Sequence, residues 1–302
     1  MISYISPVYN SEETLWDLSQ SLVRVSKKNK YKYEIILIDD GSQDRSWREI
    51  QKICSKNSNI RGIKLSKNFG QHCAVTAGIQ KARGEILIIL DCDMQDDPND
   101  IPRLIEKKKQ GYDVVITKKI IKKHSIYRKI SVKIYFYLLN KFSDIKLEND
   151  LGTMVLFTRK VANEFIKISE YHRSYTLILA WLGFNRGSIN VKQNDRLKGN
   201  SSYTLRKLLS LGIDVATSQS TSFLNFSILF GAIFIISSAI FLIILFTTSF
   251  ILNFHTGWLS IVTLILFSTG LILFMLGING IYVGKIFMQS KNRPIFIISE
   301  EM

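Results

Sequence analysis

Short apolar runs alternate with longer amphipathic segments through the first 120 residues of the chain. The runs are rich in Ile, Leu and Val and are bounded by Gly, Asp, Asn or Ser, which is typical of buried strands. Strands that alternate with helices in this way favour an α/β fold with a doubly wound, mostly parallel sheet. The predicted strands cover residues 2–6, 34–39, 60–65, 86–90 and 114–117, and the predicted helices cover residues 12–28, 45–56 and 71–81, with another from residue 100.

The region from residue 215 to residue 284 contains no Asp, Glu, Lys or Arg. It holds two apolar runs, 223–252 and 258–281, which as helices would be about 45 and 36 Å long, against a hydrocarbon core of roughly 30 Å. They predict a hairpin of two transmembrane helices; a buried hairpin in a soluble core is the alternative. Because Lys and Arg flank both ends of the pair, we expect a multi-pass protein of the cytoplasmic (inner) membrane.

These patterns divide the chain into four parts. Residues 1–200 form a large domain expected in the cytoplasm, 201–222 an amphipathic juxtamembrane segment, 223–284 the two spans, and 285–302 a cytoplasmic tail. Residues 125–141 and 203–212 combine an apolar stripe with Lys and Arg, which predicts helices lying on anionic headgroups. Packing of the same helices on the sheet is the alternative.

The net charge of +15 narrows the choice of partners. Lysine clusters at 107–109 and 118–123 could bind nucleic-acid phosphates, but the apolar block makes anionic lipid the favoured partner, and no nucleic acid is expected. The three cysteines form no CxxC pair, which suits a reducing compartment, and no signal peptide is expected. The composition excludes a purely soluble protein, a disordered chain and a collagen-like repeat. The oligomeric state is left open, and a homo-oligomer is one option.

Two pairs of carboxylates follow predicted parallel strands. Asp39 and Asp40 end one strand, and Asp91 and Asp93 follow another. Ligands of open α/β sheets bind at the carboxyl ends of the strands, and oxygen ligands suit a hard divalent cation that can hold a diphosphate. The alternative for Asp39 and Asp40 is a turn stabilised by Asx-type bonds.

Several strings of residues occur in an order that resembles a known family. They are Pro7-Val-Tyr-Asn10, Asp39-Asp-Gly-Ser42, Leu65-Ser-Lys-Asn-Phe-Gly70, Ala82-Arg-Gly-Glu85, Asp91-Cys-Asp-Met-Gln-Asp-Asp-Pro98, Trp181-Leu-Gly-Phe184 and Lys291-Asn-Arg-Pro294. The chain resembles, over nearly its whole length, the family-2 glycosyltransferases with the nucleotide-sugar (GT-A) fold. The branch is that of the polyprenyl-phosphate glycosyltransferases, which includes dolichol-phosphate mannose synthase and bacterial undecaprenyl-phosphate glycosyltransferases.

The resemblance implies roles for particular residues. The nucleotide-sugar donor is expected to contact Pro7, Tyr9, Asp39, Asp91, Cys92 and Gln95, with Asp39 reaching the base or ribose. Mg²⁺ or Mn²⁺ is expected on Asp91 and Asp93. The acceptor phosphate is expected beside Lys119, Arg128 and Arg196, and the expected catalytic residues are Asp93, Arg128 and Arg196.

The chain also departs from the family pattern. Ser11 stands where the family usually has Glu, and Thr153 and Val155 replace an acidic and a basic residue; Ser202 replaces another basic residue. The expected activity is inverting transfer of a sugar to a polyprenyl (undecaprenyl) phosphate at the cytoplasmic membrane face, for synthesis or modification of a surface glycan such as O-antigen or lipopolysaccharide. A non-catalytic homologue that binds a nucleotide-sugar or a partner is the alternative. A processive synthase is disfavoured, because the chain lacks further spans and a Gln-x-x-Arg-Trp string.

Overall fold

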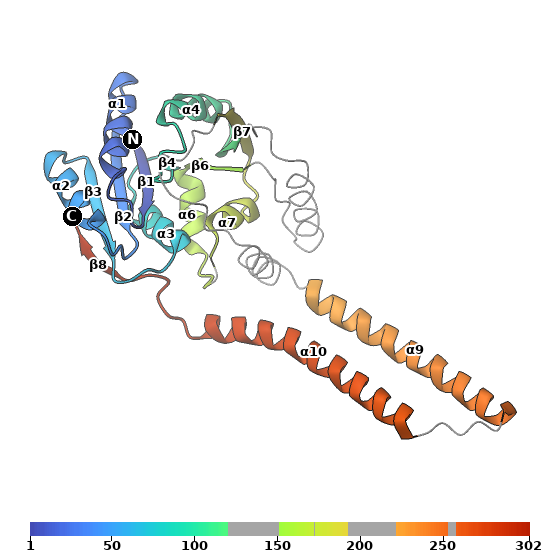
Figure 1. Cartoon of the computed structure of the whole chain (residues 1–302). Coiled ribbons are helices and arrows are strands. Elements are labelled where there is room, and N and C mark those ends of the chain that lie inside the picture. Colours follow the sequence, from blue (N-terminus) through green and yellow to red (C-terminus); the bar gives the residue numbers. More distant parts are fainter. Residues whose placement is uncertain (120–150, 172, 193–221, 253–257) are drawn as a thin grey trace. The chain divides into compact units, whose positions relative to one another are not determined.

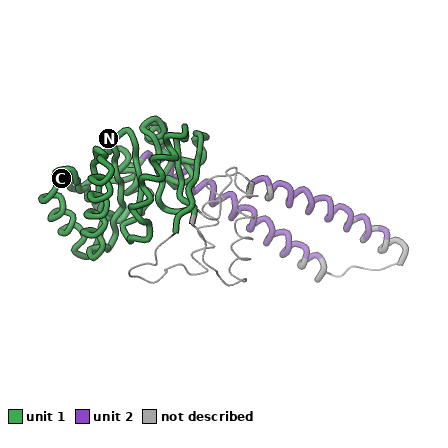
Figure 2. The backbone as a smooth tube through the Cα atoms, turned by 90° about the horizontal axis from the view of Figure 1, so that it is seen from above, with its two compact units in different colours: residues 1–133, 148–202, 293–302 green, residues 134–147, 203–292 purple. Residues whose placement is uncertain are grey.

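The computed structural model describes residues 1–119, 151–171, 173–192, 222–252 and 258–302. The chain divides into two compact units (Figure 2). The first unit comprises residues 1–133, 148–202 and 293–302, and the second comprises residues 134–147 and 203–292. Each unit is considered by itself.

The described strands of the first unit form one eight-stranded sheet in the order β7-β5-β6-β4-β1-β2-β3-β8 (Figure 1). The strands are β1 (Ile2–Val8), β2 (Tyr33–Asp39), β3 (Ile60–Leu65), β4 (Ile86–Ile89), β5 (Val114–Lys119), β6 (Leu151–Thr158), β7 (Arg186–Val191) and β8 (Ile298–Glu301). β1 pairs in parallel with β2 and β4, β2 with β3, and β5 with β7, whereas β6 runs antiparallel to β4 and β5. The prediction of a mostly parallel α/β sheet is confirmed, with β6 and β8 making the sheet mixed.

Helices cover both faces of this sheet, as a doubly wound fold requires. The helices are α1 (Leu15–Lys28), α2 (Ser46–Lys56), α3 (Gln71–Lys81), α4 (Ile101–Lys109), α6 (Arg159–Lys167) and α7 (Tyr175–Trp181), with a 3-10 turn, η1 (Pro98–Asp100), before α4. Apolar residues of α1, α2 and α4 share one buried cluster with the sheet, and those of α3, α6 and α7 share the other. Neighbouring residues of one strand alternate between the clusters, since Leu37 lies in the first and Ile38 in the second.

The last residues of the chain form β8, which the sequence analysis treated as part of a tail. β8 pairs antiparallel with β3. Glu300 forms an ion pair with Lys64 (2.9 Å), and Glu301 forms ion pairs with Arg61 (2.8 Å) and Lys81 (2.6 Å). The C-terminal segment is therefore an edge strand of the large domain.

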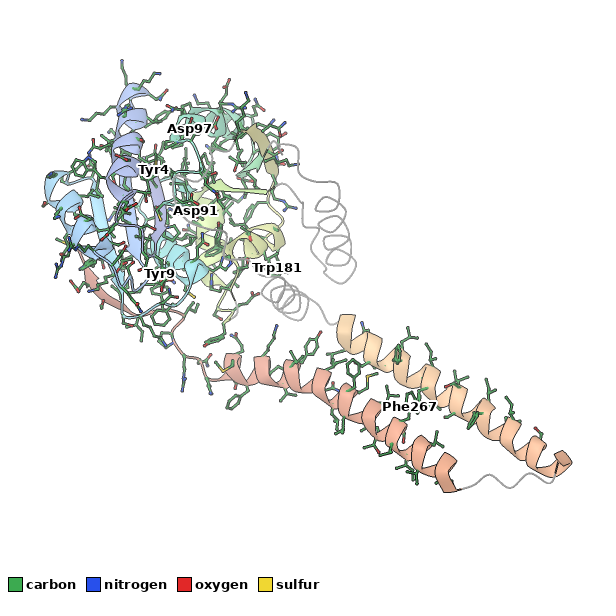
Figure 3. The ribbon with its side chains drawn as sticks, in the orientation of Figure 1. Tyr4, Tyr9, Asp91, Asp97, Trp181 and Phe267 are labelled. Atoms are coloured by element: carbon green, nitrogen blue, oxygen red, sulfur yellow. The ribbon has the colours of Figure 1, made fainter. Side chains whose placement is uncertain are left out.

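The second unit contains two long helices, α9 (Ser222–Leu252) and α10 (Trp258–Ser290). The two helices contact each other at Phe234 and Phe267, whose ring centroids lie 5.7 Å apart. Phe267 is labelled in Figure 3. Among the described residues, one stretch, Leu264–Ser290, is long and apolar enough to cross a membrane, and the comparable stretch of α9, Ser227–Phe241, is shorter. The prediction of a hairpin of two spans is thus corrected to one long apolar helix. This helix continues to Ser290, beyond the predicted end at residue 281, because Lys285 at one position does not interrupt a helix.

The predicted helices at 125–141 and 203–212 lie outside the described residues.

Candidate active site

A pocket of about 420 Å³ opens at the carboxyl ends of four neighbouring parallel strands. It is lined by Pro7, Val8, Tyr9, Asp40, Asn68, Gly70, Gln71, Asp91, Cys92 and Asp93. These residues end or follow β1, β2, β3 and β4, so strands that are far apart in sequence bring them to one edge of the sheet. Figure 3 labels Tyr9 and Asp91, from the ends of β1 and β4.

Asp40 fixes the loop of residues 66–70 that connects β3 to α3. The backbone N–H of Phe69 donates to Asp40 Oδ1 (2.7 Å), and that of Gly70 donates to Oδ2 (2.9 Å). Burial raises the pKa of Asp40, and these two bonds oppose the rise because they stabilise the carboxylate. The β3–α3 loop therefore takes its position from a buried acidic group.

Gly41 lets the backbone of the β3–α3 loop approach the turn after β2 closely. Its φ is +69°, and a Cβ there would lie 2.5 Å from the backbone N of Asn68 and 2.5 Å from the carbonyl carbon of Lys67. Glycine alone fits this conformation and this approach without strain. Asp40 and Gly41 together set one wall of the pocket.

Asp39, the last residue of β2, does not contribute to this wall. It is fully buried and does not line the pocket. Its Oδ1 accepts the backbone N–H of Ser42 (3.3 Å), while Oδ2 is buried without a hydrogen-bond partner among the described residues. Burial raises the pKa of Asp39, opposed by the hydrogen bonds from Ser42.

Residues 91–98 follow β4 and are called the acidic string here; hydrogen bonds fix the side chains of its first two carboxylates. Gln71 Nε2 donates to Asp91 Oδ1 (2.7 Å), and the backbone N–H of Gln95 donates to Asp93 Oδ1 (3.1 Å). Met94, which lies between Asp93 and Gln95, has a φ of +60°, a rare conformation for a residue other than glycine. Burial raises the pKa of Cys92 to about 11, so its thiol is neutral at pH 7 and a poor nucleophile.

Asp91 and Asp93 are the oxygen donors at this edge of the sheet that could hold a divalent cation. Two carboxylates leave most ligand positions to a diphosphate and water, as Mg²⁺ sites commonly do. The described residues contain no group of three or more His, Cys, Asp or Glu that could hold a metal ion. The donor set therefore fits a cation that arrives with a phosphate ligand and does not fit a cation held by protein alone.

Thr153 on β6 contacts the same string from the neighbouring strand. Its hydroxyl donates to Asp96 Oδ2 (2.6 Å), and Asp96 is buried. Thr153 stands where the family usually has an acidic residue. Its hydroxyl is hydrogen-bonded to the carboxylate of Asp96.

The structure brings five of the predicted site residues into one pocket: Pro7, Tyr9, Asp91, Cys92 and Asp93. Gln95 and Asp39 do not line it, and Lys119 is the last residue of β5. Arg128 and Arg196 lie outside the described residues.

Asn68, Gly70 and Gln71 also line the pocket although they were not predicted as site residues, and Asp40 lines it as a member of the first carboxylate pair. The signal available for them was their place directly after predicted strands, next to the Asp39 and Leu65–Gly70 strings.

A pocket at the carboxyl edge of a doubly wound sheet, lined by Asp91 and Asp93, defines the class of α/β proteins that bind ligands at this edge. Residues 3–166 match the family described as glycosyl transferase family 2, and the chain belongs to that family. It is a glycosyltransferase, in EC class 2.4.

Two curated relatives match nearly the full chain. The chain is 32% identical over 304 residues to the uncharacterized glycosyltransferase YkcC of Bacillus subtilis, covering 99% of this chain and 93% of that one. It is 31% identical over 309 residues to the undecaprenyl-phosphate 4-deoxy-4-formamido-L-arabinose transferase of Pectobacterium atrosepticum, with the same coverage of 99% and 93%.

Solved structures share the fold at low identity. Mannosyl-3-phosphoglycerate synthase from Rubrobacter xylanophilus matches with a TM-score of 0.53 and 14% identity, covering 72% of each chain. Glucosyl-3-phosphoglycerate synthase from Mycobacterium tuberculosis, whose structure contains Mn²⁺, uridine diphosphate and glucosyl-3-phosphoglycerate, matches with a TM-score of 0.50 and 14% identity over 72% of this chain and 77% of that one. These matches establish a GT-A-like fold.

Proposed function

We propose that the protein transfers a sugar from a nucleotide-diphosphate sugar to a polyprenyl phosphate, of the undecaprenyl class, with inversion at the anomeric carbon. The observation that carries the proposal is the pocket where Tyr9, Asp91 and Asp93 meet at the carboxyl edge of the sheet. The acceptor assignment is supported by the full-length relative from Pectobacterium, whose name specifies undecaprenyl phosphate, and by the long apolar helix.

The donor is proposed to lie in this pocket with its diphosphate beside the acidic string. Asp91 and Asp93 are the proposed ligands of Mg²⁺ or Mn²⁺, and the Mn²⁺ in the structure of the glucosyl-3-phosphoglycerate synthase supports this choice. A cation held there would offset negative charge on the leaving diphosphate. Gln71 orients Asp91 and the backbone of Gln95 orients Asp93, so both carboxylates are positioned before the donor binds.

Pro7 and Tyr9 are proposed on the nucleoside side of the donor, and Cys92 lines the pocket between the two carboxylates. Asp39 and Gln95 do not line the pocket, so Asp39 is proposed to act through the turn at Ser42 and Gln95 through its bond to Asp93. The placement of Asp40 adds a group to this set. By accepting the N–H groups of Phe69 and Gly70, it shapes the part of the wall that any nucleotide in the pocket has to meet.

The acceptor needs no carboxylate base. A phosphate monoester has its second pKa near 6, so at neutral pH it is mostly a dianion with its nucleophilic oxygen already deprotonated. That oxygen forms a bond to the anomeric carbon while the bond from this carbon to the nucleoside diphosphate breaks, and the electron pair leaves with the diphosphate. Lys119, Arg128 and Arg196 are the cations proposed to position the acceptor phosphate, with Asp93 as a catalytic residue through its contact with the cation.

The proposed location is the inner membrane with the large domain, residues 1–200, in the cytoplasm and residues 201–222 at the membrane surface. In this proposal α10 crosses the membrane and confines the enzyme to the surface where the lipid acceptor lies. The product would feed synthesis or modification of a surface glycan or lipopolysaccharide.

The test uses the full-length protein in membranes with undecaprenyl phosphate and a panel of labelled nucleotide-sugars, and measures label in the lipid extract. We expect Asp93→Ala to lower transfer by roughly a hundredfold or more, since it removes one of two carboxylate ligands. Asp17→Ala, an exposed acidic residue on α1, is the matched control and should retain activity. Transfer by Asp93→Ala at the rate of the control would contradict the metal assignment.

The alternative of a non-catalytic homologue is motivated by Thr153 and Val155. It would be favoured if the wild-type protein binds a nucleotide-sugar, transfers no sugar from any donor, and gains transfer when both positions carry the family residues, Thr153→Asp with Val155→Arg.

A further inference from the structure

The large domain contains a second pocket, of about 480 Å³, beside the donor pocket. The two pockets share Gly70 and Gln71 as lining residues. The other walls of the second pocket come from the segment that follows α6 and from the first residues after α10, which begin at Arg293. Segments far apart in the chain thus enclose one space next to the proposed donor site.

The charges of this pocket all have one sign. Lys67, Arg173 and Arg293 line it, and none of its described lining residues is Asp or Glu; Glu170, which does not line the pocket, interacts with Arg173 from outside it. The proposed donor pocket is the opposite, because it contains three carboxylates, those of Asp40, Asp91 and Asp93. The second pocket therefore suits an anion that binds without a metal ion.

Two residues that line this pocket each have a buried polar side-chain atom without a hydrogen-bond partner among the described residues. Arg173 is 7% exposed; its Nη1 donates to the carbonyl of Ile168 and its Nη2 to that of Phe165 (3.1 Å), but its Nε has no partner among the described residues. The Nδ1 atom of His72 is also buried and has no hydrogen-bond partner among the described residues. Only six buried side-chain atoms of the described residues are unpartnered, and two of them belong to residues that line this pocket.

Such atoms cost free energy unless a ligand supplies acceptors. Burial lowers the pKa of His72 to about 4, so the ring is neutral at pH 7 and one of its nitrogens carries a proton to donate. A neutral imidazole and a guanidinium Nε–H can both donate to the oxygens of an oxyanion, and the guanidinium forms charge-assisted bonds with phosphate in particular.

The chain itself ties this pocket to the end of the apolar helix. α10 ends at Ser290, and Arg293 follows three residues later. Three residues span at most roughly 10 Å, so Arg293 cannot lie far from the end of the helix that is long and apolar enough to cross a membrane. Arg293 is therefore the pocket residue that the chain joins most directly to the apolar helix.

We propose that this pocket binds the phosphate group of a membrane lipid, of the monoester class that a polyprenyl phosphate carries. The assignment of the lipid rests on the proposed function, whereas the anion chemistry rests on Lys67, Arg173, Arg293 and His72. The pocket adds to the cations proposed above for the acceptor, and it shares Gly70 and Gln71 with the proposed donor site.

The test measures equilibrium binding of a labelled prenyl phosphate to the full-length protein in phosphatidylcholine vesicles, without donor. Lys67→Gln and Arg293→Gln each remove one cation at an exposed position, and we expect each to weaken binding roughly tenfold. Lys291→Gln makes the same change two residues before Arg293, at a residue that does not line the pocket, and should bind like the wild type. Arg173 is left intact because it also caps the end of α6.

Two competitors identify the source of the phosphate. Displacement by unlabelled prenyl phosphate, but not by phosphatidylglycerol or inorganic phosphate at equal concentration, supports the proposal. Equal displacement by phosphatidylglycerol overturns the monoester class, and equal displacement by inorganic phosphate overturns the lipid. Unchanged binding in both variants overturns the site itself.

Failure of the proposed function can be told apart from failure of the proposed phosphate site, because the two are measured by different assays. If no nucleotide-sugar supports transfer, the proposed function fails, while the loss of prenyl phosphate binding in the two variants can still be measured. A nucleotide-diphosphate binding assay on Arg293→Gln completes the separation, because this variant should bind the nucleotide as the wild type does.

Discussion

Replacing Gly41 with alanine tests whether the turn after β2 shapes the proposed donor site. The added Cβ would meet backbone atoms of Lys67 and Asn68 at 2.5 Å, and backbone atoms cannot rotate away as the end of a side chain can. The β3–α3 loop then has to move, although Asp40 holds it through the N–H groups of Phe69 and Gly70. Both the stability of the domain and the shape of the pocket should suffer.

The magnitude has two parts. A residue with a Cβ at the φ of +69° costs about 1–2 kcal/mol, and overpacking against the loop costs about 1–3 kcal/mol. The free energy of unfolding should therefore fall by about 2–5 kcal/mol. Gly111→Ala is the matched control, because Gly111 also has a positive φ, +97°, but a Cβ there meets nothing within 4 Å. The control carries the backbone cost alone.

The assay combines denaturant unfolding of the detergent-solubilised protein with binding of a labelled nucleotide diphosphate. We expect Gly41→Ala to be less stable than Gly111→Ala and to bind the nucleotide at least roughly tenfold more weakly, while Gly111→Ala binds like the wild type. Equal destabilisation by the two variants, with unchanged nucleotide affinity in both, would refute the inference that the loop is packed against Gly41.

Three further predictions concern other contacts of the large domain. Thr153→Asp sets a second carboxylate against Asp96 and should lower transfer roughly ten- to a hundredfold by displacing the acidic string, whereas Thr153→Ser keeps the hydroxyl and should stay active in the lipid-extraction assay. Glu301→Gln weakens the pairing of β8 with Arg61 and should lower the free energy of unfolding by about 1 kcal/mol or less; a loss above several kcal/mol would mean that β8 does more than pair at the sheet edge. The pKa of His72 is lower in the folded state, so its contribution to stability is fully present above about pH 6.5 and is lost as the pH falls toward about 4. His72→Gln should remove this part of the pH dependence of Tm, and an unchanged Tm–pH curve would argue against a buried neutral ring.

The sequence alone determined the elements of the first 120 residues of the large domain, whereas β6, α6, α7 and β7 were not predicted. Strands such as Ile60–Leu65 and helices such as Gln71–Lys81 were predicted with the observed bounds, because apolar runs and the Gly, Asn and Ser residues that bound them are local features of the sequence. The meeting of Tyr9, Asp91 and Asp93 also follows from sequence, since parallel strands of one sheet end at the same edge.

The choice between Asp39 and Asp40 was beyond the sequence. Successive residues of a strand point to opposite faces, so an uncertainty of one residue in the end of β2 exchanges a buried carboxylate for one that lines the pocket. Helix ends carry a similar uncertainty, which is why α1 begins at Leu15 and not at residue 12.

Other features were decided by tertiary structure alone. The hydrogen bond from Thr153 to Asp96 joins β6 to the string after β4, and the pairing of β8 with β3 joins segments more than 200 residues apart in the chain. No local pattern marks such partners, because Ile298–Glu301 is too short and too polar to signal a strand by itself. Long-range pairing and packing select these contacts, and the second pocket exists only because the fold brings Lys67, Arg173 and Arg293 around one space.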